Sequence, residues 1–197
     1  HTNDVVHLFE RSDTRAIVGF QFWRTITLQL PRTRAIVGGK LRILPAYRRQ
    51  GLHLRSGLRF FASRQLAHPR TRFYRISIAS IFGFTSIASA LSEYHLFNPQ
   101  AADPEGHALA GAFQQLASGS GYQLARDEAV IRVNIFITSE TLALYPDAFF
   151  EKPAARVYAG INPGYRSNGC YVGFWFRFSR RNLVALVQAV RQLRSRR

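Results

Sequence analysis

Residues 35–65, AIVGGKLRILPAYRRQGLHLRSGLRFFASRQ, form the stretch of sequence that most strongly indicates the fold. Residues 35–44 are rich in aliphatic and β-branched side chains, and they end at Pro45, which interrupts strand hydrogen bonding. From residue 51 to residue 65 apolar side chains recur at helical spacing. We therefore expect a strand, a short basic turn and a helix here.

The segments on either side predict the rest of the sheet. Residues 5–11 and 15–29 are rich in Val, Ile, Phe, Trp and Thr and are separated by a polar turn, which is typical of an antiparallel hairpin. Residues 73–80 predict a buried strand, and residues 84–94 predict a second helix. Alternating strands and helices imply parallel pairing. The expected fold class is α/β, a mixed sheet with an antiparallel start and a parallel centre, flanked by helices.

The second half continues with helices and strands. We predict helices at residues 104–118 and 179–193 and strands at residues 129–136, 156–161 and 170–178. We expect a single domain, in which residues 1–99 form the core and residues 100–197 form a C-terminal extension that completes the sheet.

Positive charge is concentrated in two blocks. The chain has 27 Lys and Arg against 11 Asp and Glu, a net charge of +16. Residues 15–92 carry +14 and residues 152–197 carry +10, whereas residues 93–151 carry −6. Because 47% of the residues are hydrophobic, the chain can bury a core in spite of this charge. The basic blocks favour an anionic partner or substrate.

The turn between the strand and the helix is the best candidate for binding chemistry. It reads Arg48-Arg49-Gln50-Gly51-Leu52-His53, directly before the helix. The first backbone N–H groups of a helix and its positive end attract anions, and a glycine allows close approach to the backbone. This turn is suited to a pyrophosphate; the alternative is an ordinary turn with solvated arginines.

These residues resemble the GCN5-related N-acetyltransferase (GNAT) superfamily. In that family an Arg/Gln-x-x-Gly-x-Gly/Ala turn after the central strand binds the pyrophosphate of coenzyme A. This chain matches in the arginine and the first glycine, and it has His53 at the last position. The resemblance covers residues 5–99 and implies that residues 1–99 form a thioester-binding core. The residues that would bind the donor are Ile43, Leu44, Arg48, Arg49, Gln50, Gly51, Leu52 and His53.

The resemblance also implies acyl transfer from a thioester to an amine, which needs an acid for the departing thiolate and a base for the amine. In the family the acid is often a tyrosine on the helix after the parallel strand, and Tyr94 has about that place. Glu93 and His53 are the candidate bases that we favour. The other available candidates are His95, Glu10 and Glu140.

Aromatic residues in the C-terminal half suggest a large apolar substrate if some of them line a tunnel. Long-chain N-acyl amino acid synthases and acyl-homoserine lactone synthases are GNAT-like proteins that have such tunnels. The expected co-substrate is therefore acyl-CoA or the acyl-phosphopantetheine of an acyl carrier protein, and the acceptor is a small-molecule or peptide amine. An acidic carrier protein would be attracted to the basic blocks.

The same charge supports a second hypothesis, a basic RNA- or DNA-binding protein with a GNAT-like fold and no catalysis. Its footprint would include the basic C-terminal end, residues 191–197. The single cysteine, Cys170, excludes an internal disulfide and a thiolate metal cluster, and we expect no metal. No hydrophobic run approaches the roughly 20 apolar residues of a membrane span. We expect a reducing, cytoplasmic compartment.

Overall fold

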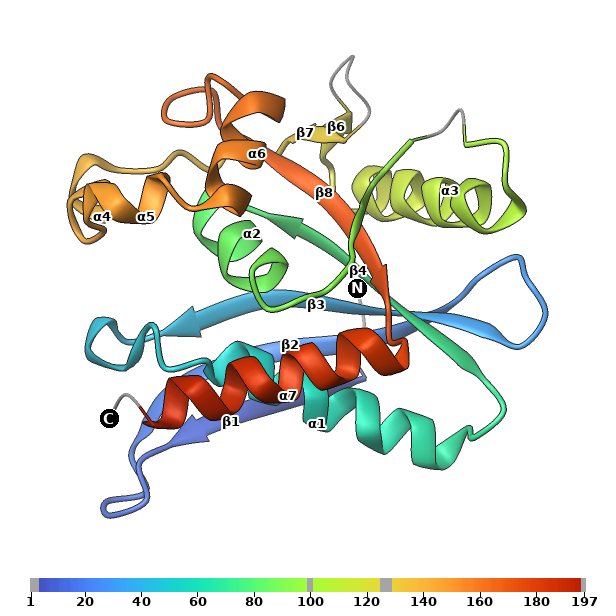
Figure 1. The fold of residues 1–197 in the computed structure, drawn as a ribbon, viewed down its shortest axis with the longest axis horizontal. Coiled ribbons are helices and arrows are strands. Elements are labelled where there is room, and N and C mark those ends of the chain that lie inside the picture. The colour runs from blue at the N-terminus through green and yellow to red at the C-terminus, as the bar shows by residue number, and fades with distance from the viewer. Residues whose placement is uncertain (1–3, 99–100, 125–128, 196–197) are drawn as a thin grey trace. The chain divides into compact units, whose positions relative to one another are not determined.

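The computed structural model describes residues 4–98, 101–124 and 129–195, and Figure 1 shows how its strands and helices follow one another. Arg196 and Arg197 of the basic end lie outside the described residues. The strands are β1 (Val5–Glu10), β2 (Ile17–Thr27), β3 (Thr33–Ile43), β4 (Arg72–Ala79), β5 (His95–Leu96), β6 (Gln123–Leu124), β7 (Val130–Arg132) and β8 (Cys170–Arg177). The helices are η1 (Pro45–Tyr47), α1 (Leu52–Ala67), α2 (Ile81–Ala88), α3 (Pro104–Gly119), α4 (Ser139–Ala143), α5 (Asp147–Phe150), α6 (Pro153–Ile161) and α7 (Arg180–Ser195).

Hydrogen bonding arranges the strands of the described residues in the order β1-β2-β3-β4-β8-β7-β6, and β5 pairs with β8. Both β1 with β2 and β2 with β3 are antiparallel. β3 and β4 are parallel, as the α1 crossover between them requires. The expected fold class, an α/β fold with a mixed sheet flanked by helices, is confirmed.

The chain divides into two compact units. Unit 1 comprises His1–Arg75 and Arg177–Arg197, and unit 2 comprises Ile76–Phe176. Unit 1 has 22 basic against 3 acidic side chains, a net charge of +19. Unit 2 has 5 basic against 8 acidic side chains, a net charge of −3. The excess positive charge of the protein therefore resides in unit 1.

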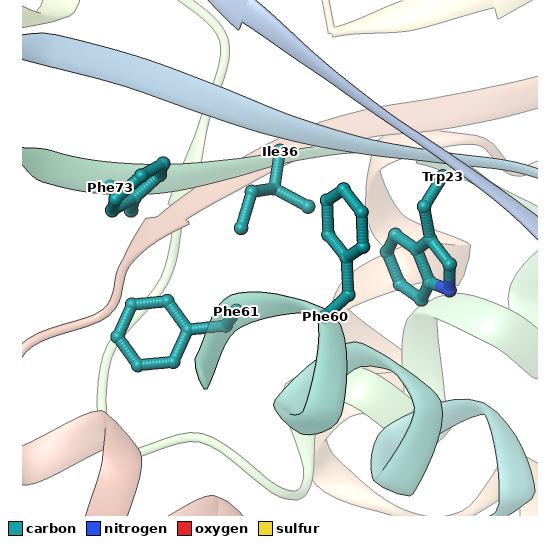
Figure 2. Packing of buried hydrophobic residues seen from close by; sticks show 5 residues of the cluster. All are labelled: Trp23, Ile36, Phe60, Phe61 and Phe73. Atoms are coloured by element: carbon teal, nitrogen blue, oxygen red, sulfur yellow. The ribbon is translucent and has the colours of Figure 1, made fainter. Parts of the chain in front are cut away.

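The core of unit 1 forms between its sheet and α1. Trp23 of β2 and Phe60 of α1 are almost fully buried, and their rings stack with centroids 5.5 Å apart (Figure 2). Phe61 stacks on Phe178 at 4.2 Å, and Leu183 of α7 packs against the same cluster. Both α1 and α7 therefore cover the sheet face that carries Trp23.

The core of unit 2 is largely aromatic. Phe84 of α2 lies edge-on to Tyr158 of α6 and to Phe174 of β8, with centroid distances of 5.4 and 4.9 Å. The Tyr158 hydroxyl donates to the Ala79 carbonyl at 3.3 Å. These contacts hold α2 and α6 together beside β8.

One predicted strand is a helix. Residues 156–161, predicted as a strand, form most of α6. Pro153 lies in the first turn of α6, where its lack of an N–H costs no hydrogen bond. Ala154, Ala155 and Tyr158 are buried at helical spacing. The β-favouring Val157 and Tyr158 were misleading because the helix begins before them.

Two further elements are shorter than predicted. The helix predicted over residues 84–94 is α2, which begins at Ile81 and ends at Ala88, so Tyr94 is not on a helix. The chain is extended at β5 because His95 pairs with Trp175 of β8. The strand predicted over residues 129–136 is limited to β7, because Asn134 has φ +54° and cannot continue a strand.

Candidate functional site

The turn predicted to bind an anion begins where β3 ends. Ile43 is the last residue of β3, and the Leu44 N–H donates to the Val18 carbonyl of β2 at 2.9 Å. Pro45 opens η1 at a position that needs no N–H. The chain therefore leaves the sheet at Leu44 and turns immediately.

Two exposed arginines follow in this turn. The Arg48 Nε donates to the Ile43 carbonyl at 3.1 Å, and the Gln50 side-chain amide donates to the Ala46 carbonyl at 3.4 Å. Arg49 has φ +62°, a left-handed conformation that is uncommon for a residue with a side chain. Hydrogen bonds to the chain's own carbonyls thus shape the turn while both arginines stay at the surface.

Gly51 is the N-cap of α1, and two features of the structure favour glycine at this position. Its φ is +67°, which favours glycine. An added Cβ would also lie 2.7 Å from Cδ1 of Leu193 in α7. The backbone conformation and the packing of α7 therefore explain this glycine without a ligand.

The N-terminal end of α1 is suited to an anion. The first intrahelical hydrogen bond runs from the Arg55 N–H to the Gly51 carbonyl at 3.0 Å, so the N–H groups before it have no acceptor within the helix. No side chain caps this end, and the first turn contains no acidic residue. The positive pole of α1 therefore directly follows a turn with two exposed arginines, Arg48 and Arg49, and both features favour an anion.

His53 lies in this first turn, and both it and Leu52 are half-buried. Burial lowers the pKa of His53 to about 4, and the charge of Arg75 adds to the shift. The imidazole is neutral at neutral pH, which is the form that a base needs. With this pKa it holds an accepted proton weakly, which argues against His53 as the main base.

Arg75 is itself buried. It is 6% exposed, and its guanidinium lies 4.9 Å from the centre of the Trp23 ring. Burial lowers the pKa of Arg75 to about 10, so the group stays charged at neutral pH. The charge of this buried cation adds to the effect of burial in keeping the pKa of His53 low.

Tyr94 lies in unit 2, directly before β5. Its ring is half-buried and edge-on to Phe84 and Phe174, with centroid distances of 5.5 and 6.2 Å. Burial raises the pKa of Tyr94 above its ordinary value. The hydroxyl is therefore protonated at neutral pH, as a general acid must be.

The carboxylate candidates have structural partners. Glu93 is exposed, and its Oε1 lies 3.2 Å from Nε2 of His95, whose ring stacks on Trp175 at 4.3 Å. Glu10 pairs with Arg15 at 2.9 Å. Hydrogen bonds from its own backbone N–H and from Thr138 lower the pKa of Glu140, at the start of α4.

The residues expected to bind the donor, Ile43 to His53, lie together in unit 1. Tyr94 and Glu93 belong to unit 2. Their assignments as acid and base stay predictions.

Sequence reasoning missed a buried hydrogen-bond network under α1. The Trp23 Nε1–H donates to Ser56 Oγ at 2.8 Å, and Ser56 Oγ lies 2.8 Å from Nδ1 of His7. Burial lowers the pKa of His7, and the nearby charge of Arg59 adds to this. Because Ser56 is only 5% exposed, a substrate cannot reach its hydroxyl. We therefore interpret the Ser56–His7 contact as one that stabilises unit 1 and not as an activated nucleophile. No local motif links three residues that are far apart in the chain.

Among residues 4–98, 101–124 and 129–195, no three His, Cys, Asp or Glu side chains lie close enough to hold a metal ion. Likewise, none of the helices in that part of the chain combines the length and the apolar character needed to cross a membrane.

Comparisons of this chain with protein-family models, with curated proteins and with solved structures give no significant match.

Proposed function

We propose that this protein is an N-acyltransferase that moves an acyl group from a thioester, acyl-CoA or an acyl carrier protein, to an amine. The observation that carries the proposal is the uncapped N-terminus of α1, preceded by two exposed arginines in the turn between η1 and α1. A diphosphate suits such an end, because backbone N–H groups and arginines can bind phosphate oxygens together.

The charge of unit 1 supports an anionic donor. With a net charge of +19, this unit attracts the phosphates of coenzyme A and the acidic surface of a carrier protein alike. The attraction accelerates encounter and weakens as ionic strength rises above roughly 0.1 M, where the screening length is about 10 Å. The confirmed α/β fold, with a parallel β3–β4 pair connected through α1, agrees with the GNAT resemblance of the sequence.

The direct test is an assay of thiol release. The protein is mixed with acyl-CoA or acyl carrier protein of several chain lengths and with a panel of amines. We expect amine-dependent release of free thiol. The double variant Arg48→Gln/Arg49→Gln is expected to raise KM for the donor roughly tenfold while kcat stays the same, because phosphate contacts bind substrate and transition state equally.

Arg70→Gln is the matched control. Arg70 is exposed and follows the opposite, C-terminal end of α1. The control keeps its KM if the arginines at the N-terminal end bind the donor. An equal rise in KM in the control would mean that general charge attracts the donor, and no release with any donor would refute the proposal.

The acid assignment has its own variant. Tyr94→Phe keeps the ring contacts with Phe84 and Phe174 and removes only the hydroxyl. Loss of a general acid is expected to lower kcat by about 100-fold with little change in KM. Unchanged turnover would exclude Tyr94 from this role.

A further inference from the structure

The sheet of unit 1 has a second face that the proposed function does not use. Trp23 and Gln21 of β2 point to the buried face under α1. Side chains alternate along a strand, so Phe20 and Phe22 point to the opposite face. Both rings are only half-buried, and their centroids lie 5.5 Å apart.

The neighbouring strands extend this face. Phe22 pairs with Val6 of β1 and Gly39 of β3, and Phe20 pairs with Leu8. Val6 and Leu8 are 45% and 52% exposed. We define the open face of unit 1 by six residues, namely Leu8, Phe20, Phe22, Arg24, Lys40 and Arg42.

The open face remains accessible beside Phe22. A Cβ added to Gly39 would meet no atom within 4 Å, which shows free space next to the ring. The two long helices described in unit 1, α1 and α7, pack on the Trp23 face. The rings are therefore available to a flat ligand.

Cations surround these rings. The Lys40 ammonium lies 5.8 Å from the centre of the Phe22 ring. Arg42 pairs with Phe20, and Arg24 follows Phe22 on the same side of β2. Residues 14–75 and 177–197 of unit 1 contain no Asp or Glu. Of the acids at the margin of this face, Glu10 pairs with Arg15, and Asp4 accepts the Thr25 N–H at 2.7 Å.

We propose that the open face of unit 1 binds single-stranded nucleic acid, with bases stacked on Phe20 and Phe22 and phosphates held by Arg24, Lys40 and Arg42. Half-buried aromatic rings on an open sheet face with a basic margin suit this ligand, because every base has a stacking surface and every nucleotide has a negative charge. A second copy of the chain is disfavoured, because two units of +19 repel each other. A duplex hides its bases and gains only the phosphate contacts.

The test measures binding of fluorescein-labelled single-stranded DNA of 20 thymidines to the full chain by anisotropy, at 50 and 200 mM salt. A duplex with the same number of phosphates is measured beside it. We expect the single strand to bind at least tenfold more tightly than the duplex. Equal affinity, or no binding at 50 mM salt, would overturn the proposal.

Three variants locate the site. Phe22→Leu keeps an apolar side chain and removes the ring, so it is expected to weaken binding about tenfold. Gly39→Glu places a negative charge in the free space without a clash, and it is expected to weaken binding at least as much. Arg42→Gln is expected to reduce the slope of log affinity against log salt by about 0.7, the value for one phosphate on a single strand.

The matched control is Arg59→Gln, which removes the same charge from an exposed position on α1. It is expected to change affinity less than twofold, and thermal melting checks that all variants fold. If Arg59→Gln weakens binding as much as Arg42→Gln, general charge and not the open face holds the strand, and the proposal fails. It also fails if phosphatidylglycerol vesicles or polyglutamate bind more tightly than the oligonucleotide and lose affinity in Phe22→Leu.

Discussion

Gly51→Ala is expected to destabilise unit 1 by about 2 kcal/mol. The left-handed conformation at φ +67° destabilises the folded state by roughly 1–2 kcal/mol for a residue with a Cβ. Alanine also lowers the conformational entropy of the unfolded chain, which offsets roughly 0.4–1 kcal/mol of this effect. The new Cβ lies 2.7 Å from Cδ1 of Leu193, so that side chain must leave its rotamer at about 0.5–1.5 kcal/mol. Denaturation in urea, followed by tryptophan fluorescence, measures the change.

Two further variants separate these causes. Leu193→Ala removes the contacting atom, so the effects of Gly51→Ala and Leu193→Ala should be less than additive by about 1 kcal/mol. Gly39→Ala is the control, because its Cβ meets nothing within 4 Å and its φ lies outside the left-handed range. If Gly51→Ala is as stable as Gly39→Ala, the structural explanation of this glycine is wrong.

Two other predictions concern the buried polar groups of unit 1. Folding lowers the pKa of His53 from 6.5 to about 4, so the unfolded chain takes up the proton first as pH falls. The free energy of unfolding is therefore expected to decrease by roughly 2–3 kcal/mol between pH 6.5 and about pH 4. Urea titrations across this range should show a smaller decrease for His53→Gln. Ser56→Ala leaves Trp23 Nε1 and His7 Nδ1 without their 2.8 Å partner and is expected to cost about 2–3 kcal/mol, so an unchanged melting temperature would contradict the network.

Local patterns sufficed for the elements around the candidate site. β3 ends at Ile43 because Pro45 follows, and the apolar spacing after Gly51 produced α1 where we expected it. The strand prediction at residues 156–161 was wrong because it relied on the β propensity of Val157 and Tyr158. Pro153, which is favourable in the first turn of a helix, was the better signal. β propensity is the weaker signal, since it depends on the surroundings of each side chain.

The parts of the site that the sequence did not predict all depend on long-range contacts. The packing of Leu193 on Gly51 joins the last helix to the N-terminus of α1. The low pKa of His53 arises from its burial in the folded chain and, to a lesser extent, from the charge of the buried Arg75. Tyr94 was placed on a helix because nothing local reveals that His95 pairs with Trp175.

The central claim is that the N-terminus of α1 binds the phosphates of a thioester donor. The most direct measurement is a titration of ¹⁵N-labelled protein with an acyl-CoA thioether, followed by amide chemical shifts. We predict that the largest shifts occur at the backbone N–H groups of Leu52 and His53 and disappear in Arg48→Gln/Arg49→Gln. Saturable binding whose largest shifts lie outside residues 43–55, or no shifts at all, would contradict the account.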